Sequence, residues 1–221
     1  MSARRTASKL LVGIAVLASA HGAHAAPDWQ VSGFATLGAV YTRSDELQFA
    51  RVGIDAPGGD HVDLGPDSVL GLQLGLQFGQ GTGAVVQVTT RETQRGDYDP
   101  RPALAFVSHA LSPGLTVRAG RLRSPFFMLS DTADINYSQP WVRLPAEVYG
   151  LNPFADLDGI DLLHRSRVGD AFVELHPYFG ASRIPVIGGG HARLQRLRGL
   201  TMTVEAGEFS FSAGHALAEL A

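Results

Sequence analysis

The 221-residue sequence contains no cysteine, and Lys9 is its only lysine. Without cysteine there are no disulfide bridges, cysteine nucleophiles or thiolate metal sites, which excludes the class of small secreted proteins stabilised by disulfides. Beyond residue 25, no stretch approaches the roughly 20 consecutive apolar residues that a transmembrane helix needs. The sequence is therefore not that of a helical membrane protein.

The first 25 residues have the layout of a secretory signal peptide. Three cations come first, an apolar core follows at residues 10–20, and Ala23-His24-Ala25 fits a small-x-small cleavage site. The apolar core is too short to span a bilayer as a helix, which favours cleavage over a membrane anchor. We therefore predict an exported protein with a signal peptide at residues 1–25 and one mature domain at residues 26–221.

The mature chain is acidic. Residues 1–25 hold three cations and no acids, so 15 cationic and 21 acidic residues remain, a formal net charge of −6. Nucleic-acid binding needs a cationic surface that displaces counterions, so we expect no nucleic-acid partner. Composition alone leaves open both a soluble globular protein and a barrel that is apolar outside and polar inside.

Residues 70–79, LGLQLGLQFG, alternate between large apolar side chains and glycine or glutamine. Such period-two alternation predicts a β-strand with one apolar face and one polar face. About ten residues is also the length of a strand that crosses a bilayer at a tilt. A soluble β-sandwich shows the same pattern, so this segment alone is compatible with both.

Similar segments recur along the chain and predict about nine antiparallel strands. They are residues 31–41, 70–79, 84–93, 103–111, 115–121, 160–168, 171–180, 200–206 and 209–215. Short connections lie near 80–83, 112–114, 169–170 and 207–208, and long ones at 42–67, 94–102, 122–158 and 181–199. Tight turns at one end of the strands and long loops at the other are typical of outer-membrane barrels. We therefore predict an all-β fold, namely an antiparallel transmembrane β-barrel that is either complete or partial.

The longest of these connections, residues 122–158, is rich in aromatic side chains and contains four prolines. Aromatic area of this size needs a surface to pack on, and in a water-filled barrel that surface is the inner wall. We therefore predict that the segment folds inward after the fifth strand and narrows the channel; an extracellular lid or an oligomer contact is the alternative. Folded inward, it carries four charged residues into the permeation path: Asp131, Asp134, Arg143 and Glu147.

If the apolar strand faces contact lipid, the opposite faces line water, because a charge on the lipid side costs a few kcal/mol at mid-depth. This assigns several charged side chains to the channel lumen or its vicinity: Arg91, Arg118, Arg121, Arg123, Arg165 and Glu174. Arginines opposite the acids of the inward segment would create a transverse field that tunes selectivity. Ordinary ion pairs at the rim are the alternative, and the preferred sign of the permeant ion stays open.

Three stretches resemble Gram-negative outer-membrane porins: AGRLRSPFF at residues 119–127, YSQPWVRLP at 137–145 and EVYG at 147–150. The opening VSGF at residues 31–34 is similar to that family too. The resemblance extends from residue 31 to about residue 163 and is specific mainly at 119–150. It implies a β-barrel in outer-membrane lipid, often a homotrimer, whose third external loop folds inward as a constriction. It also implies passive diffusion of small hydrophilic solutes.

The sequence departs from that family in its ending and in its strand count. Porin chains end in a strand with a terminal aromatic residue, whereas this sequence stops at Glu219-Leu220-Ala221. Bacterial barrels also close with an even number of strands. We therefore expect the sequence to be an N-terminal part of a longer porin.

Signals for catalysis or cofactor binding are weak. The histidines show no metal-ligand spacing, and Ser108 and His109 would point to opposite faces of a strand, so they cannot form a catalytic pair. The run Gly188-Gly189-Gly190 has no following helix that would support a phosphate site. We expect no catalytic, metal or cofactor site. The other functions considered are an exported soluble β-sandwich binding module and, with less support, an outer-membrane barrel hydrolase.

Overall fold

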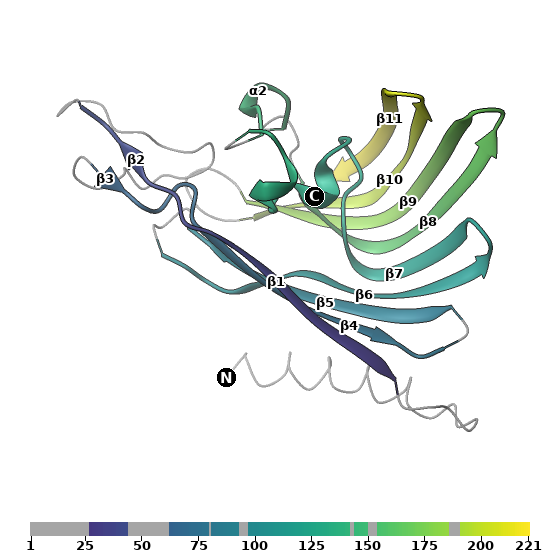
Figure 1. The fold of residues 1–221 in the computed structure, drawn as a ribbon, viewed down its shortest axis with the longest axis horizontal. Coiled ribbons are helices and arrows are strands. Elements are labelled where there is room, and N and C mark those ends of the chain that lie inside the picture. The colour runs from purple at the N-terminus through teal and green to yellow at the C-terminus, as the bar shows by residue number, and fades with distance from the viewer. Residues whose placement is uncertain are drawn as a thin grey trace.

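Nine antiparallel strands form one large sheet and follow each other in chain order (Figure 1). The computed structural model describes residues 27–43, 62–79, 81–92, 97–141, 144–149, 154–185 and 191–221, so the predicted signal peptide lies outside it. The strands of the sheet are β1 (Asp28–Thr36), β4 (Val69–Gln77), β5 (Thr82–Arg91), β6 (Arg101–Ser112), β7 (Leu115–Arg123), β8 (Asp156–Val168), β9 (Ala171–Pro185), β10 (His191–Ala206) and β11 (Phe209–Leu220).

The remaining elements are short. Strands β2 (Val40–Tyr41) and β3 (Val62–Asp63) form a separate two-stranded sheet. Between β7 and β8 lie two 3₁₀ turns, η1 (Ser130–Thr132) and η2 (Asn136–Ser138), and the four-residue helix α2 (Ala146–Tyr149). None of the helices in the described part of the chain has the length and apolar character needed to cross a membrane.

Each of the nine predicted segments overlaps one strand of the sheet, so the all-β antiparallel fold is confirmed. Several strand ends differ from the prediction: β8 begins earlier, β9 and β11 end later, and residues 181–185 and 191–199, predicted as part of a long connection, belong to β9 and β10. The differences are largest in β1 and β10. Strand β1 ends at Thr36, and the chain then leaves the sheet to form β2. Strand β10 begins at His191, well before residue 200. The sequence did not reveal this earlier part of the strand, because a β-bulge interrupts its alternation. The register shifts between Leu194 and Leu197, and Arg196 has a φ of 49° there.

The short turns lie at one end of the sheet, as the sequence predicts, and the long connections lie at the other. Gly169 and Gly207 begin the two-residue turns after β8 and β10, with φ of 62° and 59°. Glycine adopts this left-handed conformation without a steric penalty, which allows the strands to reverse within two residues. We call these two ends of the sheet the turn end and the loop end.

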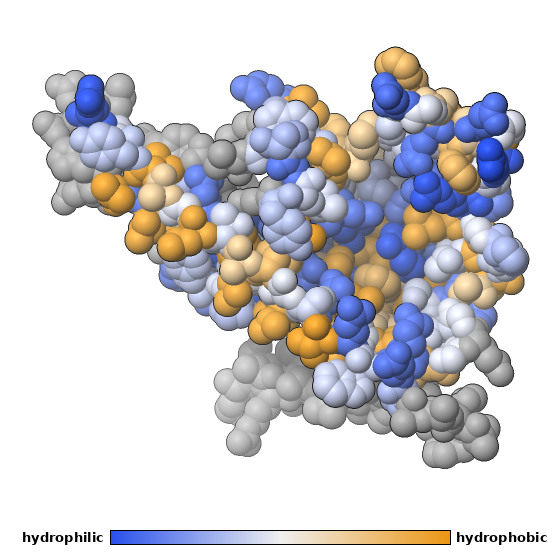
Figure 2. Space-filling view, viewed as in Figure 1, coloured by the Kyte–Doolittle hydropathy of each residue, from blue (hydrophilic) through white to orange (hydrophobic). Residues whose placement is uncertain are grey.

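The sheet curves into a trough (Figure 1). Its two faces differ in the chemistry of their side chains. The inner face carries polar side chains; for example, Gln87 Nε2 donates a hydrogen bond to Oε1 of Gln73 on the neighbouring strand at 2.9 Å. Hydrophilic side chains are visible within this hollow in the space-filling view (Figure 2). The outer face carries exposed apolar side chains such as Leu72, which is 57% exposed, and Phe179, which is 54% exposed.

The sheet is open. Within the described residues, the edge strands β1 and β11 do not pair with each other. The pairing registers show that both strands run from the turn end to the loop end, so they are parallel to each other. The structure therefore shows a large antiparallel sheet, and the closed transmembrane barrel stays a prediction.

A cluster of buried apolar side chains lies on the inner face near the loop end. Its members are Leu122, Phe154, Leu157, Tyr178, Leu194 and Leu197. Phe126 packs against this cluster from residues 124–155, which connect β7 to β8. We call residues 124–155 the inner segment, because the trough of the sheet contains its described residues (Figure 1).

Candidate functional site

The inner segment is fixed to the sheet at its base. Ser124 N–H donates to the carbonyl oxygen of Ala155 at 2.9 Å, which joins the beginning of the segment to its end. On the inner face of β10, Thr201 Oγ1 donates to the carbonyl oxygen of Pro125 at 2.7 Å. The first bond closes the base of the segment, and the second holds it against β10, which follows it in the chain.

Aromatic side chains of the inner segment pack on one another edge to face. The ring centroid of Phe126 lies 4.9 Å from that of Phe127 and 5.6 Å from that of Phe154. Phe127 in turn lies 5.2 Å from Tyr149 of α2. The rings therefore pack mainly on one another. Phe126 also packs on the buried apolar cluster of the inner face.

Asp134 connects the inner segment to two strands of the sheet. Its Oδ1 lies 3.0 Å from NH1 of Arg91 on β5, and its Oδ2 bonds NH2 of Arg123 at the end of β7. The Asp134 and Arg123 side chains are each largely buried. The structure thus brings together three residues that lie far apart in the sequence. A carboxylate that is hydrogen-bonded to two cations is held in place more firmly than one in an exposed ion pair.

Arg118 does not present a free positive charge on the inner face. Its Nε and NH2 donate to the two carboxylate oxygens of Asp161 at 2.9 and 2.5 Å. The Asp161 side chain is fully buried, and its Oδ2 also lies 2.7 Å from Nε2 of His176. Sequence reasoning did not single out Asp161, because the identity of the strand residue opposite Arg118 depends on the register between β7 and β8.

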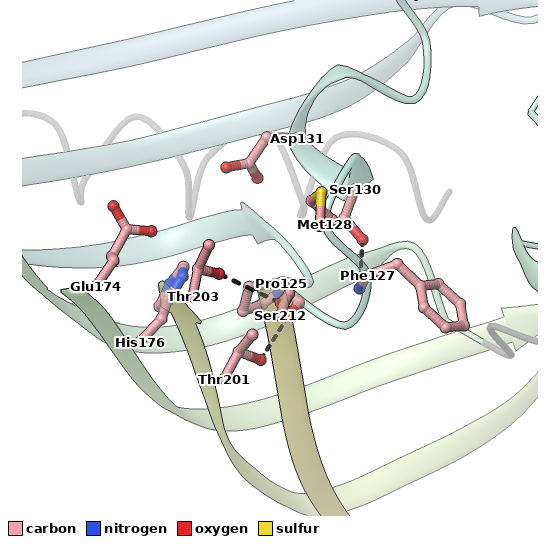
Figure 3. A pocket seen from close by; sticks show the side chains of 10 residues that line it. All are labelled: Pro125, Phe127, Met128, Ser130, Asp131, Glu174, His176, Thr201, Thr203 and Ser212. Atoms are coloured by element: carbon pink, nitrogen blue, oxygen red, sulfur yellow. Dashed lines mark hydrogen bonds between the residues drawn. The ribbon is translucent and has the colours of Figure 1, made fainter. Parts of the chain in front are cut away.

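A cavity of about 50 Å³ lies between the inner segment and strands β9 to β11 (Figure 3). Its lining residues are Pro125, Phe127, Met128, Ser130, Asp131, Glu174, His176, Thr201, Thr203 and Ser212. The carboxylates of Asp131 and Glu174 approach it from opposite sides, one from the segment and one from the wall. Neither carboxylate forms an ion pair within the described residues, although Arg118 attracts both electrostatically.

Arg121 lies on the other face of β7 from Arg118. The register aligns Arg121 with Ala105 and Asp158, which belong to the outer-face rows of β6 and β8. Its Nε and NH2 donate to the Asp158 carboxylate at 2.7 and 2.8 Å, and both side chains are partly exposed. The two arginines therefore belong to different surfaces of the sheet.

The remaining predicted residues are more peripheral. Arg165 NH2 donates to Glu205 Oε2 at 2.6 Å near the turn end, and both side chains are about half exposed. Glu147 is exposed on α2. Arg143 lies outside the described residues. The structure thus separates the predicted set into a central group around the inner segment and a group at the rim.

The charged groups of this site offer little for catalysis. In the part of the chain that the structure describes, no three His, Asp or Glu side chains are grouped so that they could hold a metal ion. Asp161 and His176 form an acid–imidazole pair, but the group next to them is the Arg118 guanidinium, which cannot act as a nucleophile. The arrangement places paired charges around a narrow gap between the inner segment and the sheet.

No protein-family model matches this chain, and no curated protein matches it either. Its function therefore has to be inferred from its own residues and their geometry.

Proposed function

We propose that this chain forms the wall of an outer-membrane channel of the porin type. Small hydrophilic and charged solutes would pass by passive diffusion along the inner face of the sheet. The inner segment would narrow that path, and the charges beside it would set the selectivity. No chemical step is involved.

The observation that carries this proposal is the row of large apolar side chains exposed on the outer face. It runs across the sheet and includes Leu70, Leu72, Leu74, Val86, Val88, Ile160, Phe179, Leu200, Met202 and Phe211. Soluble monomers rarely expose apolar patches of this extent, because water solvates them poorly. Acyl chains remove that cost, and the strand ladders satisfy the backbone groups that lipid cannot.

The inner face supports the same proposal by its opposite character. Charged and amide side chains such as Arg118, Asp161 and Gln87 lie there, where a bilayer-facing position would be costly. An aromatic, proline-rich segment then lies over this polar face rather than over the apolar one. In a water-filled barrel that placement reduces the cross-section of the pore.

The direction of the strands restricts how a closed wall would form. Because β1 and β11 are parallel, an antiparallel wall needs an odd number of additional strands between them. Nine strands plus an odd number give an even total, which is the rule for bacterial outer-membrane barrels. The open sheet is therefore compatible with a partial barrel wall.

Location and assembly belong to the proposal as well. The signal-peptide pattern at residues 1–25 supports export, and the resemblance at residues 119–150 supports an outer-membrane porin that assembles as a homotrimer. A soluble β-sandwich would cover the apolar face with a second sheet. Within the described residues, the only other sheet is the two-residue pairing of β2 with β3.

Two measurements test the proposal. The membrane-extracted protein should migrate differently on gels before and after heating, and it should give discrete conductance steps in a planar lipid bilayer. A protein that stays in the aqueous fraction and yields no conductance steps would contradict a channel. Release from membranes by carbonate alone would favour the soluble binding module instead.

A further inference from the structure

We propose that the outer face carries a docking surface for phosphate-bearing lipid head groups, formed by Arg183, Arg193 and Arg198 at the loop end of β9 and β10. The inference rests on the proposed membrane location of the sheet. It adds a partner that differs from the permeant solute, on the face opposite the channel.

The pairing register places Arg183 and Arg193 directly opposite each other. Their neighbours Ser182 and Leu194 also face each other and are buried on the inner face. Since side chains alternate along a strand, the two arginines point to the outer face, and both are exposed.

The β-bulge extends this cationic surface along β10. Leu194 and Leu197 are both buried on the inner face, so the bulge leaves Arg196 exposed between them. Arg198 then follows on the outer face, opposite Phe179. Without the extra residue, alternation would place Arg193 and Arg198, which are five positions apart, on opposite faces of the sheet.

The nearby acids are already engaged. Glu219 on β11 accepts two hydrogen bonds from NH1 of Arg196, at 3.0 and 3.1 Å. Asp158 on β8 is held by Arg121, and Asp156 at the start of β8 lies 3.8 Å from NH1 of Arg123. Within the described residues, Arg183, Arg193 and Arg198 form no ion pair, so the surface has a net positive charge.

Like charges placed directly opposite each other destabilise a sheet, so the pair of Arg183 and Arg193 needs an anionic partner to be favourable. A guanidinium matches a phosphate group in shape and binds it through two parallel hydrogen bonds. A phosphate group therefore fits this pair of guanidinium groups, as a carboxylate would.

The position of the cationic surface indicates a lipid as the source of the phosphate. On β10 the exposed apolar residues Leu200 and Met202 lie towards the turn end, and the arginines begin where they stop. That border is where a bilayer changes from acyl chains to head groups, and basic clusters at this depth bind anionic lipids. Long loops of outer-membrane barrels lie outside the cell, so the lipids belong to the outer leaflet.

The test compares the full chain with the double variant Arg183→Gln, Arg193→Gln in phosphatidylcholine vesicles. The measured quantity is the association of spin-labelled phosphatidic acid relative to spin-labelled phosphatidylcholine. An arginine near an anionic surface is worth about fivefold in affinity, so the double variant should lose about tenfold or more of that preference. The double variant Arg101→Gln, Arg167→Gln removes the same charge away from the surface and should keep the preference.

Each result decides the question. Equal association of both lipids with the unaltered chain would overturn the docking surface while leaving the channel intact. Loss of the preference on addition of inorganic phosphate would assign the arginines to a free anion and overturn the lipid partner. A double variant that changes its oligomeric state but keeps its lipid preference would also overturn the lipid partner. Failure to enter neutral vesicles at all, seen as a missing heat-dependent gel shift, would contradict the channel itself.

Discussion

Arg118 lies directly opposite Asp161 in the ladder between β7 and β8, and its guanidinium bonds both oxygens of that buried carboxylate. In the proposed channel, this pair would change how the inner face acts on a permeating ion. A cation that is neutralised by a buried neighbour contributes a local dipole rather than a net charge. Arg91 and Arg123 share the carboxylate of Asp134, and Asp156 lies 3.8 Å from NH1 of Arg123 as a second acid.

Breaking the buried pair should therefore cost stability. We expect Arg118→Ala to lower the free energy of unfolding by about 3 kcal/mol, because it leaves the Asp161 carboxylate buried without its cation. The matched variant Arg165→Ala breaks a half-exposed pair with Glu205 and should cost at most about 1 kcal/mol. Urea titration of the folded protein in lipid vesicles, read by the heat-dependent gel shift, measures both. Equal losses in the two variants would contradict the buried pair.

The inner segment should control the size of the path. Asp134→Ala removes the carboxylate that joins the segment to Arg91 and Arg123, so the segment should loosen from the wall. We expect a larger and noisier single-channel conductance and faster uptake of larger sugars in vesicle-swelling assays. Asp170→Ala, in an exposed pair at the turn end, is the control and should leave conductance unchanged. An unaltered conductance in the Asp134 variant would mean that the segment does not limit the pore.

The sign of the selectivity should follow the two carboxylates that lie outside the ion pairs. Asp131 and Glu174 form no ion pair within the described residues, and the arginine that attracts both of them, Arg118, is already bound to Asp161. We therefore expect a preference for cations, seen as the sign of the reversal potential under a salt gradient. Asp131→Asn with Glu174→Gln should reduce that preference, and Glu208→Gln in an exposed turn should not. An anion preference in the unaltered protein would contradict this electrostatic picture.

Neighbouring positions of β4 distinguish lipid from water on the two faces. Leu74 is 38% exposed on the outer face, and Gln73 lies beside it on the inner face. We expect Leu74→Arg to destabilise the protein in lipid by about 2–4 kcal/mol, as charges do at the lipid face of barrels, and Gln73→Arg by about 1 kcal/mol or less, from one lost hydrogen bond. Unfolding titrations in vesicles measure the difference. Equal effects of the two variants would remove the support for a lipid-facing surface.

Local alternation was sufficient to predict the number, order and approximate position of the strands, because each strand has one apolar face. It failed along β10, where the bulge at Arg196 puts two successive residues out of phase. It also predicted that Arg91 and Arg118 face the inner region, whereas Asp134 was assigned there because the aromatic segment that carries it was expected to fold inward. What it could not supply were the partners of these charges.

Partners depend on register and on how a long connection lies over the sheet, and neither is encoded in a single segment. Asp161 became identifiable only when β8 was aligned with β7. Arg121 and Arg123 are two residues apart, yet one pairs with Asp158 on the outer surface and the other with Asp134 of the inner segment. Gly120, with a φ of 133°, lies just before them and departs from regular strand geometry.

The shared direction of β1 and β11 also bears on self-assembly. Two copies inserted with the same orientation in a membrane would meet along two seams where the strands run the same way, so they could not share one continuous antiparallel wall. In the proposed channel, the subunits of a trimer would thus associate side by side through outer surfaces, and each wall would need further strands of its own to close.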